Sequence, residues 1–136
     1  MKRDHIVPLA PQAVAVLREL RALHGADSSP LLFPSPSRDG YMSNNTMLYA
    51  IYRMGYHGRA TIHGFRAMAS TALNEMGFRS DVIERQLAHQ EKNAVRAAYN
   101  HAEYLTERRM MMRRWADHID ALETGNIAKF RSKSNI

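Results

Sequence analysis

The stretch Thr61–Leu73, TIHGFRAMASTAL, decides what kind of fold the chain adopts. Its apolar residues recur at every third or fourth position and continue to Met76, a pattern that predicts an amphipathic helix with one face in a core. Gly77 then fits the C-terminal stop of that helix. The same stretch places His63 and Arg66 three residues apart on one helix face, where an imidazole and a guanidinium can converge on one anion.

This spacing alone is weak evidence for a binding site. The chain has 7 histidines and 15 arginines in 136 residues, so about 0.8 such pairs are expected by chance. Taken by itself, the pair is explained more simply by polar side chains on a solvated helix face. Its interpretation therefore depends on the sequence around it.

Helical periodicity recurs on both sides of this stretch. Ser43 can cap an upstream helix that Gly55 ends, and Ser80 and Asp81 can cap a short downstream helix. A loop rich in proline and serine lies upstream, over residues 27–40. The predicted helices cover, in chain order, residues 11–24, 43–54, 61–76, 80–89, 94–99 and 105–122. We therefore predict a mainly α fold.

One short extended run precedes these helices. His5–Leu9 reads as a strand that Pro8 confines to a sheet edge or a strand end, and nothing downstream supplies an obvious partner. We predict a β-strand remnant here, in a chain that begins in the middle of a larger fold. At the other end, residues 124–136 are basic and lack periodicity, which predicts a flexible tail after a partial domain over residues 1–123.

The composition narrows the class of protein. Hydrophobic residues make up 45% of the chain, enough for a core, and no apolar run approaches the roughly 18 residues that cross a bilayer. The absence of cysteine excludes disulfides and thiolate metal sites. A net charge of +6 and a pI of about 10 favour a polyanionic partner, although many soluble proteins are basic for no special reason.

Three motifs follow one another in the second half of the chain. They are HGFR at residues 63–66, LAH at 87–89 and YNH at 99–101. In this order and at this spacing they resemble the C-terminal motifs of the tyrosine recombinases, the phage integrase family. The surrounding sequence is similar to prophage integrases of enterobacterial type, and the resemblance covers most of residues 1–120. An ordered set of motifs is far more specific than any one of them.

The resemblance implies roles for four residues. Tyr99 would attack a DNA phosphate and form a 3′-phosphotyrosine with a free 5′-hydroxyl. Arg66 would grip the scissile phosphate, His63 would contact it and serve as acid–base partner, and His89 would hydrogen-bond a non-bridging oxygen. Tyrosine suits this chemistry because its aryl phosphate can be attacked again by a DNA hydroxyl. Since its ordinary pKa is about 10, nearby cations or a base must activate it.

The family also implies partners and a setting. The substrate would be double-stranded DNA attachment sites of a mobile element, on which copies of the protein associate with one another. No metal, ATP or other cofactor is implied, and no membrane. The protein would be bacterial or phage-encoded, in the cytoplasm and associated with the nucleoid.

The chain departs from the family pattern in three places. The family uses an arginine early in the catalytic domain, which has no counterpart here, and a lysine in a β-hairpin turn, which by spacing would fall just before Met1. Lys2 looks slightly late, so it is not assigned that role. Ala88 replaces the commoner glycine of the LGH motif. We expect a truncated product or a fragment, with weak or absent strand cleavage on its own.

Other interpretations remain open. The chain could be a DNA-binding module without catalysis, in which Tyr99 is structural. A metal site built from His63, His89 and His101 is disfavoured because no closely spaced ligand pair supports it. Tyr104 lies outside the family pattern and is expected to pack against or cap the last helix.

The apolar stripe of the last helix admits two roles. The stripe is expected to pack on its own domain, with packing on a neighbouring protomer as the alternative. Its predicted members are Leu105, Arg109, Met112, Trp115, Ala116, Ile119 and Leu122.

Overall fold

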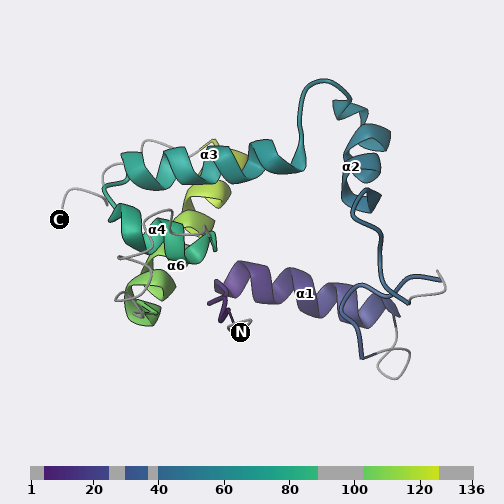
Figure 1. The fold of residues 1–136 in the computed structure, drawn as a ribbon, viewed down its shortest axis with the longest axis horizontal. Coiled ribbons are helices and arrows are strands. Elements are labelled where there is room, and N and C mark those ends of the chain that lie inside the picture. The colour runs from purple at the N-terminus through teal and green to yellow at the C-terminus, as the bar shows by residue number, and fades with distance from the viewer. Residues whose placement is uncertain (1–4, 25–29, 37–39, 89–102, 126–136) are drawn as a thin grey trace, which may run out of the picture. The chain divides into compact units, whose positions relative to one another are not determined.

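The computed structural model describes residues 5–24, 30–36, 40–88 and 103–125 (Figure 1). The elements in these ranges are α1 (Pro11–His24), α2 (Thr46–Ile51), η1 (Tyr52–Tyr56), α3 (Ile62–Glu75), α4 (Ser80–Gln86) and α6 (Leu105–Glu123). The element η1 is a π-type helical turn that directly follows α2. The mainly α prediction is confirmed for these residues. The predicted helix through Tyr99, and the tail beyond Gly125, lie outside them.

The chain divides into two compact units. The first joins Met1–Pro11 to Ala69–Ile136, and the second is Gln12–Met68. Helix α3 runs across the boundary, so its first two turns belong to the second unit and the remainder to the first.

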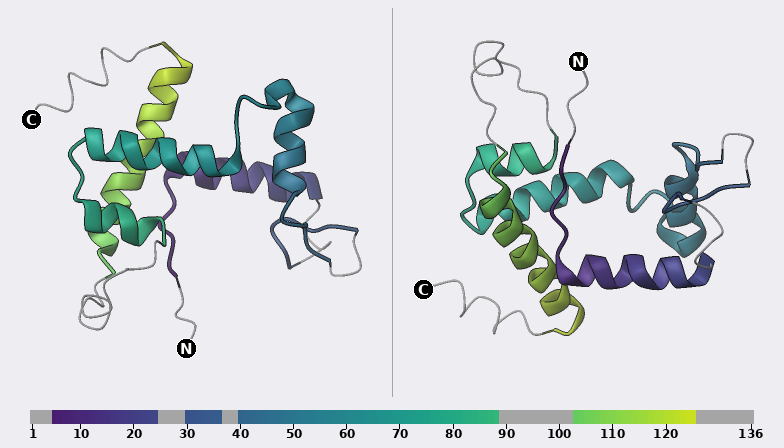
Figure 2. Two further views of the ribbon diagram at one scale, coloured as in Figure 1. Left: turned by 45° about the horizontal axis from the view of Figure 1, so that its top comes forward. Right: turned by 90° about the horizontal axis from the view of Figure 1, so that it is seen from below.

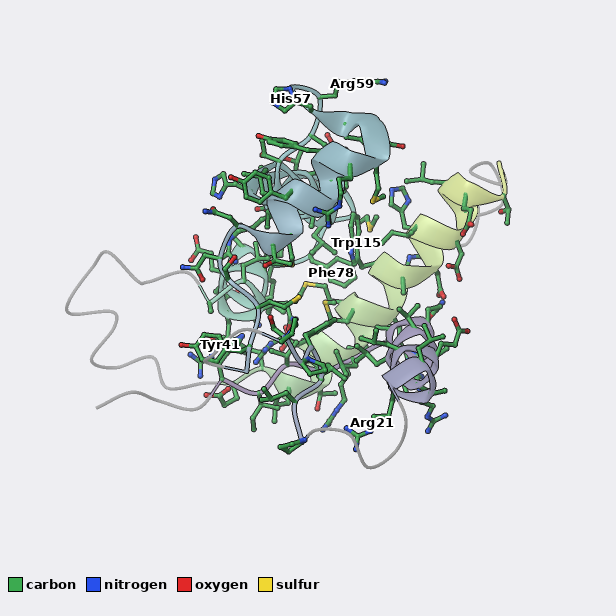
Figure 3. The ribbon with its side chains drawn as sticks, turned by 90° about the vertical axis from the view of Figure 1, so that its right-hand side faces the viewer. Arg21, Tyr41, His57, Arg59, Phe78 and Trp115 are labelled. Carbon is green, nitrogen blue, oxygen red and sulfur yellow. The ribbon has the colours of Figure 1, made fainter. Side chains whose placement is uncertain are left out.

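The core of the first unit lies where α3, α4 and α6 meet. Its fully or nearly fully buried side chains are Leu73, Val82, Ile83 and Met111. Around them pack the partly buried side chains of Met76, Phe78, Leu87, Tyr104, Met112 and Trp115, of which Phe78 and Trp115 are labelled in Figure 3. Each fully buried apolar side chain contributes roughly 1.5–3 kcal/mol. This cluster therefore forms the apolar core of the described part of the unit.

Helix α3 begins close to the predicted position and ends at the predicted glycine, and the structure adds a cap by Thr61 that the sequence analysis did not assign. At its start, the Thr61 hydroxyl accepts a hydrogen bond from the Gly64 backbone N–H at 2.9 Å, a side-chain N-cap. At its end, Gly77 takes a left-handed conformation with φ of 82°. The Phe78 N–H then donates to the carbonyl of Leu73 at 3.2 Å, closing the last turn. The helix that carries the HGFR motif is thus defined by local sequence signals.

The predicted N-terminal strand does not form among the described residues. A strand needs a partner to satisfy its backbone groups, and within these residues the β-pairing is a single antiparallel bridge between Pro34 and Tyr41. The extended run is held by side chains instead. Arg108 donates to the carbonyl oxygen of Ile6 at 2.5 Å, and His5 Nε2 lies 3.3 Å from the carbonyl oxygen of Gln86.

The upstream helix starts later than predicted. Helix α2 begins at Thr46 after Asn45, which makes no side-chain cap, whereas Ser43 forms a turn through its carbonyl and a 3.1 Å contact between its hydroxyl and that of Thr46. Gly55 does adopt the left-handed conformation expected of a stop, with φ of 86°, but it sits inside η1, which continues to Tyr56.

Helix α4 is shorter than predicted and capped differently. Its N-cap residue is Arg79, which makes no side-chain cap, while Ser80 donates to Asn74 instead of to the helix end. The Asp81 carboxylate accepts the N–H of its neighbour Val82. The helix ends at Gln86 rather than near His89, since Ala88 already has a left-handed φ of 51°.

No helix in the described part of the chain is both long and apolar enough to span a membrane.

Candidate active site at the start of helix α3

The predicted His63–Arg66 pair lies on the first turns of α3. Because residues 62–75 are helical, the two side chains project from the same face, as the spacing predicts. His63 is exposed and Arg66 is half-buried. The hydrogen bond between the Thr61 hydroxyl and the Gly64 N–H stabilises this first turn. An exposed imidazole next to a partly buried guanidinium can approach a phosphate from one side.

An open hollow of about 390 Å³ adjoins this turn within the second unit. Gly64 is part of its wall, and a Cβ at that position would come within 3.2 Å of the Thr61 hydroxyl. The wall combines aromatic rings with one guanidinium, and its residues are Tyr52, Gly58, Arg59, Ala60, Thr61, Gly64, Phe65 and Met68. The start of α3 is thus bordered by an apolar and cationic surface.

The loop before α3 contributes ring contacts that motif-based reasoning missed. The Arg59 guanidinium lies 5.8 Å from the centroid of the Tyr56 ring, and the His57 ring meets the Tyr52 ring at 4.3 Å (Figure 3 labels His57 and Arg59). The sequence signal was available, because Tyr56, His57 and Arg59 lie around a single glycine, Gly58. It lacked specificity, since such a loop is usually solvated.

The other two predicted site residues, His89 and Tyr99, lie outside the described residues. The gathering of four groups around one phosphate therefore stays a prediction. The metal-site alternative also involves undescribed histidines. Among the residues that the structure does describe, no group of three histidine or carboxylate side chains is placed to hold a metal ion.

Tyr104 packs against the start of α6 and joins a polar cluster. It is the N-cap residue of α6, with φ of 46°, although its side chain makes no capping hydrogen bond, and it packs against the core, so the expectation that it packs against or caps the last helix is confirmed. Its hydroxyl bonds to Asp81, and its ring lies under the Arg79 guanidinium at 5.3 Å. Arg79 in turn pairs with Asp81 at 2.6 Å and with Glu107 at 3.5 Å. This cluster ties the start of α4 to the start of α6.

The cluster predicts a loss of stability in acid. Partial burial opposes the charge of Asp81, but hydrogen bonds from Arg79 and Tyr104 outweigh it and hold the pKa of this carboxyl below its ordinary value of 3.8. A carboxyl with a lowered folded pKa stabilises the fold above the unfolded pKa, and that contribution disappears as the pH falls through the folded value. Between about pH 5 and pH 3 the wild type should therefore lose more unfolding free energy than Asp81→Asn.

Urea titrations at the two pH values measure this difference. Glu84→Gln, a change at an exposed carboxylate on the same helix, is the control and should behave like the wild type. Equal losses in the wild type and Asp81→Asn would contradict the assignment.

Comparison with known proteins shows the family to which the chain belongs. The model of the phage integrase family matches residues 1–105, a range that includes the HGFR, LAH and YNH motifs. The chain belongs to the phage integrase family. The resemblance inferred from the three motifs is thereby confirmed at the level of the family.

Several integrases are similar to this family member over most of its length. Prophage integrase IntA of Escherichia coli (strain K12) is 46% identical over 128 residues, which are 93% of this chain and 30% of that protein. The integrase of Enterobacteria phage P4 is 49% identical over 125 residues, covering 88% and 28%. The integrase of Shigella phage Sf6 is 37% identical over 119 residues. The chain thus spans about 30% of the length of these relatives. No solved structure matches it.

Ala88, which stands where the commoner integrase motif has glycine, adopts a backbone conformation that is strained for alanine. Its φ of 51° lies in the left-handed region, where a residue with a Cβ costs roughly 1–2 kcal/mol and glycine pays no such penalty. Glycine at this position of the LGH motif would adopt the same turn without strain. The integrase chain accepts this strain immediately before His89.

Proposed function

We propose that the chain is the C-terminal part of an integrase catalytic domain that cleaves and rejoins double-stranded DNA during site-specific recombination. Such recombination integrates or excises a mobile element at attachment sites. The observation that carries the proposal is the family match over residues 1–105, together with the HGFR motif on the capped first turns of α3.

Arg66 and His63 act on the scissile phosphate in this proposal. A phosphodiester under attack accumulates negative charge on its non-bridging oxygens, and a planar guanidinium can stabilise two of them at once. His63 contacts the same phosphate and transfers protons as acid–base partner. Their common helix face supports these roles, because both groups can reach one anion.

Tyr99 and His89 complete the proposed reaction. The phenolate oxygen of Tyr99 attacks the phosphorus, a bond to tyrosine forms, and the 5′-oxygen leaves with a proton as a hydroxyl. His89 donates a hydrogen bond to a non-bridging oxygen. The phosphotyrosine retains the energy of the broken bond, so that attack by a new DNA hydroxyl reseals the strand without an external energy source.

The 136 residues alone are expected to cleave weakly or not at all. They contain no counterpart of the family's early arginine, and the family's lysine is not assigned. Loss of one donor from a charge-stabilising site typically costs about 10²–10³ in rate. We further propose that the complete enzyme acts as several copies on DNA, in the cytoplasm and close to the nucleoid.

A chimera tests the proposed function. In it, this chain replaces the matching 28% of phage P4 integrase, so that the relative supplies the groups that are missing here. The probe is a nicked DNA duplex on which the parental integrase forms a covalent adduct. The chimera is expected to form the adduct and the 136-residue chain to form little or none, as measured on denaturing gels.

One result would argue against this function, and another would argue against the expected weakness of the isolated chain. A soluble, helical chimera that binds the duplex but never forms an adduct would favour the non-catalytic DNA-binding module. Efficient adduct formation by the 136 residues alone would show that the missing groups are dispensable.

A further inference from the structure

The arginines that the structure describes in the first unit fall into two groups. One group has interaction partners, and its members are Arg79, Arg85, Arg108 and Arg114. The other group is Arg109 and Arg113, which are exposed and form no ion pair or hydrogen bond with any other described residue. Both arginines of this second group lie on α6, four residues apart.

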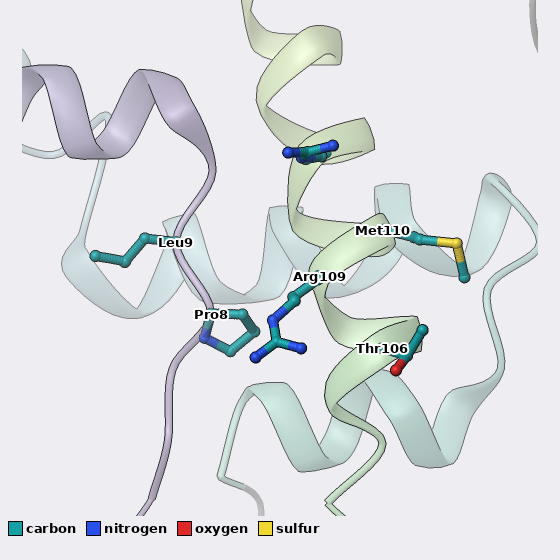
Figure 4. A pocket seen from close by; sticks show the side chains of 6 residues that line it. Pro8, Leu9, Thr106, Arg109 and Met110 are labelled. Carbon is teal, nitrogen blue, oxygen red and sulfur yellow. The ribbon is translucent and has the colours of Figure 1, made fainter.

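These two arginines line one open hollow of about 340 Å³ in the first unit (Figure 4). Thr106 and Met110 line it from the same face of α6, because all four positions recur at helical spacing. Pro8 and Leu9 contribute the N-terminal part of the wall, and Figure 4 shows the Arg109 side chain extending from α6 toward Pro8. The described residues that line the hollow include no carboxylate.

The N-terminal wall of the hollow is held in place by contacts on either side of it. Nη2 of the buried Arg108 donates to the carbonyl oxygen of Ile6 at 2.5 Å, and His5 Nε2 lies 3.3 Å from the carbonyl oxygen of Gln86. In Figure 2 the extended N-terminal segment passes beside α6, where the contact with Arg108 is made. The hollow is therefore formed by the fold itself, so that little conformational freedom is lost when a ligand binds.

The arrangement of Arg109 and Arg113 does not favour the stability of the helix. Like charges four residues apart on a helix repel each other, and arginine stays charged throughout the physiological pH range. An anion between the two guanidinium groups replaces this repulsion by attraction to both of them. A ligand therefore explains the pair better than the stability of the fold does.

We propose that this hollow binds the sugar–phosphate backbone of the DNA substrate. A phosphate accepts hydrogen bonds from both guanidinium groups and from the Thr106 hydroxyl. The deoxyribose next to it is apolar on one side, and Leu9 and Met110, which are 50% and 58% exposed, offer it an apolar surface. The chain's net charge of +6 also favours a polyanion. The choice of DNA rests on the proposed function, whereas the anion site rests on the two arginines.

The hollow is separate from the groups that act on the scissile phosphate. His63 and Arg66 have that role in the proposed function, and neither lines the hollow. Contacts with phosphate and sugar fix the position of a protein on DNA and carry no sequence information. The hollow therefore contributes affinity and placement, and it takes no part in the chemical step.

Salt-dependent binding of a random-sequence DNA duplex to the 136-residue chain tests the proposal by fluorescence anisotropy. A double variant with Arg109→Gln and Arg113→Gln is expected to bind at least roughly tenfold more weakly. The slope of log affinity against log salt should become shallower by about 0.9, the value for one phosphate. Thr106→Val removes only the hydroxyl and should weaken binding roughly threefold without changing the slope.

The control for this experiment combines Arg18→Gln with Arg21→Gln. It removes the same charge from exposed positions on α1, and it should lower the affinity less and leave the slope unchanged. Equal losses in the two double variants would overturn the proposal, because net charge alone would then explain them. An unaltered chain that does not bind the duplex would overturn it as well.

Two further measurements separate a DNA site from other uses of the arginines. The urea midpoint of the variant altered at Arg109 and Arg113 should be no lower than that of the wild type, because the substitutions remove a repulsion. A lower midpoint would show that the pair serves the fold. Polyglutamate at equal charge concentration should displace the duplex only weakly. Equal displacement, or a loss of self-association in place of DNA binding, would identify an acidic protein partner and contradict the proposal.

The chimera separates binding from chemistry. Altering Arg109 and Arg113 in it should raise the DNA concentration for half-maximal adduct formation at least roughly tenfold while leaving the rate at saturation unchanged. A lower saturating rate at an unchanged half-maximal concentration would refute the binding role. If the unaltered chimera forms no adduct, the proposed function fails, and the anisotropy experiment still decides whether the hollow binds the DNA backbone.

Discussion

Replacing Tyr99 by phenylalanine is expected to abolish the covalent protein–DNA adduct of the chimera. Phenylalanine preserves the ring and its packing but lacks the oxygen that would attack phosphorus. No other group on the chain is proposed to replace this nucleophile, so the loss should be complete on a denaturing gel. DNA binding should persist, with the same dependence on salt, because it rests on arginine and lysine contacts with phosphates.

Tyr104→Phe is the matched control for this experiment. The Tyr104 hydroxyl bonds to Asp81 in the polar cluster, and its ring packs on the core. Its loss should lower stability slightly and leave the adduct in place. An adduct formed by Tyr99→Phe but not by Tyr104→Phe would reverse the assignment of the nucleophile, whereas adducts with both would exclude Tyr99 from the chemistry.

Met111→Ala is expected to lower the free energy of unfolding of the first unit by about 2–5 kcal/mol. Met111 is 0% exposed and lies in the cluster with Leu73, Val82 and Ile83. Truncation removes its apolar contacts and leaves a cavity that the surrounding helices can only partly fill. Because a domain of this size is stable by only about 5–15 kcal/mol, a large part of the folded population could be lost. Urea denaturation followed by circular dichroism measures the change.

Met110→Ala offers a control on the adjacent residue. Met110 is 58% exposed and borders an open hollow of the first unit, beside Pro8 and Arg109 (Figure 4). Its truncation should change the free energy of unfolding by no more than about 0.5 kcal/mol. Equal effects of the two alanine substitutions would show that the cluster around Met111 is not the core of this unit.

The apolar periodicity of the last helix predicted only part of the buried face of α6. The sequence predicted an inward stripe that includes Arg109, Ile119 and Leu122. In the structure Arg109 lines the open hollow of Figure 4, and Ile119 and Leu122 are 44% and 50% exposed. Met112, Trp115 and Ala116 were predicted to face inward, and they do pack or are buried. The run RRMMM at residues 108–112 contains two arginines and then three methionines, so the sequence does not show which arginine and which methionines face the core.

Arg108 was missed for a related reason. Arginine is rarely buried without partners, so a pattern of apolar residues assigns it to the surface. Its partners Ile6, Gln86 and Glu103 come from three parts of the chain, and only the folded arrangement brings them together. The predicted strand at the N-terminus has the same explanation, because the backbone carbonyl of Ile6 accepts a hydrogen bond from the Arg108 guanidinium instead of from a second strand.

The sequence by itself determined the family, the mainly α class and the helix that carries His63 and Arg66. These depend on local signals: the order of three motifs, the period of apolar residues, the Thr61 cap and the Gly77 stop. Tertiary structure alone decided which arginine of α6 is buried and how the N-terminal segment is held. Those outcomes depend on contacts between residues as many as 102 positions apart, and no local pattern encodes the partner of a buried charge.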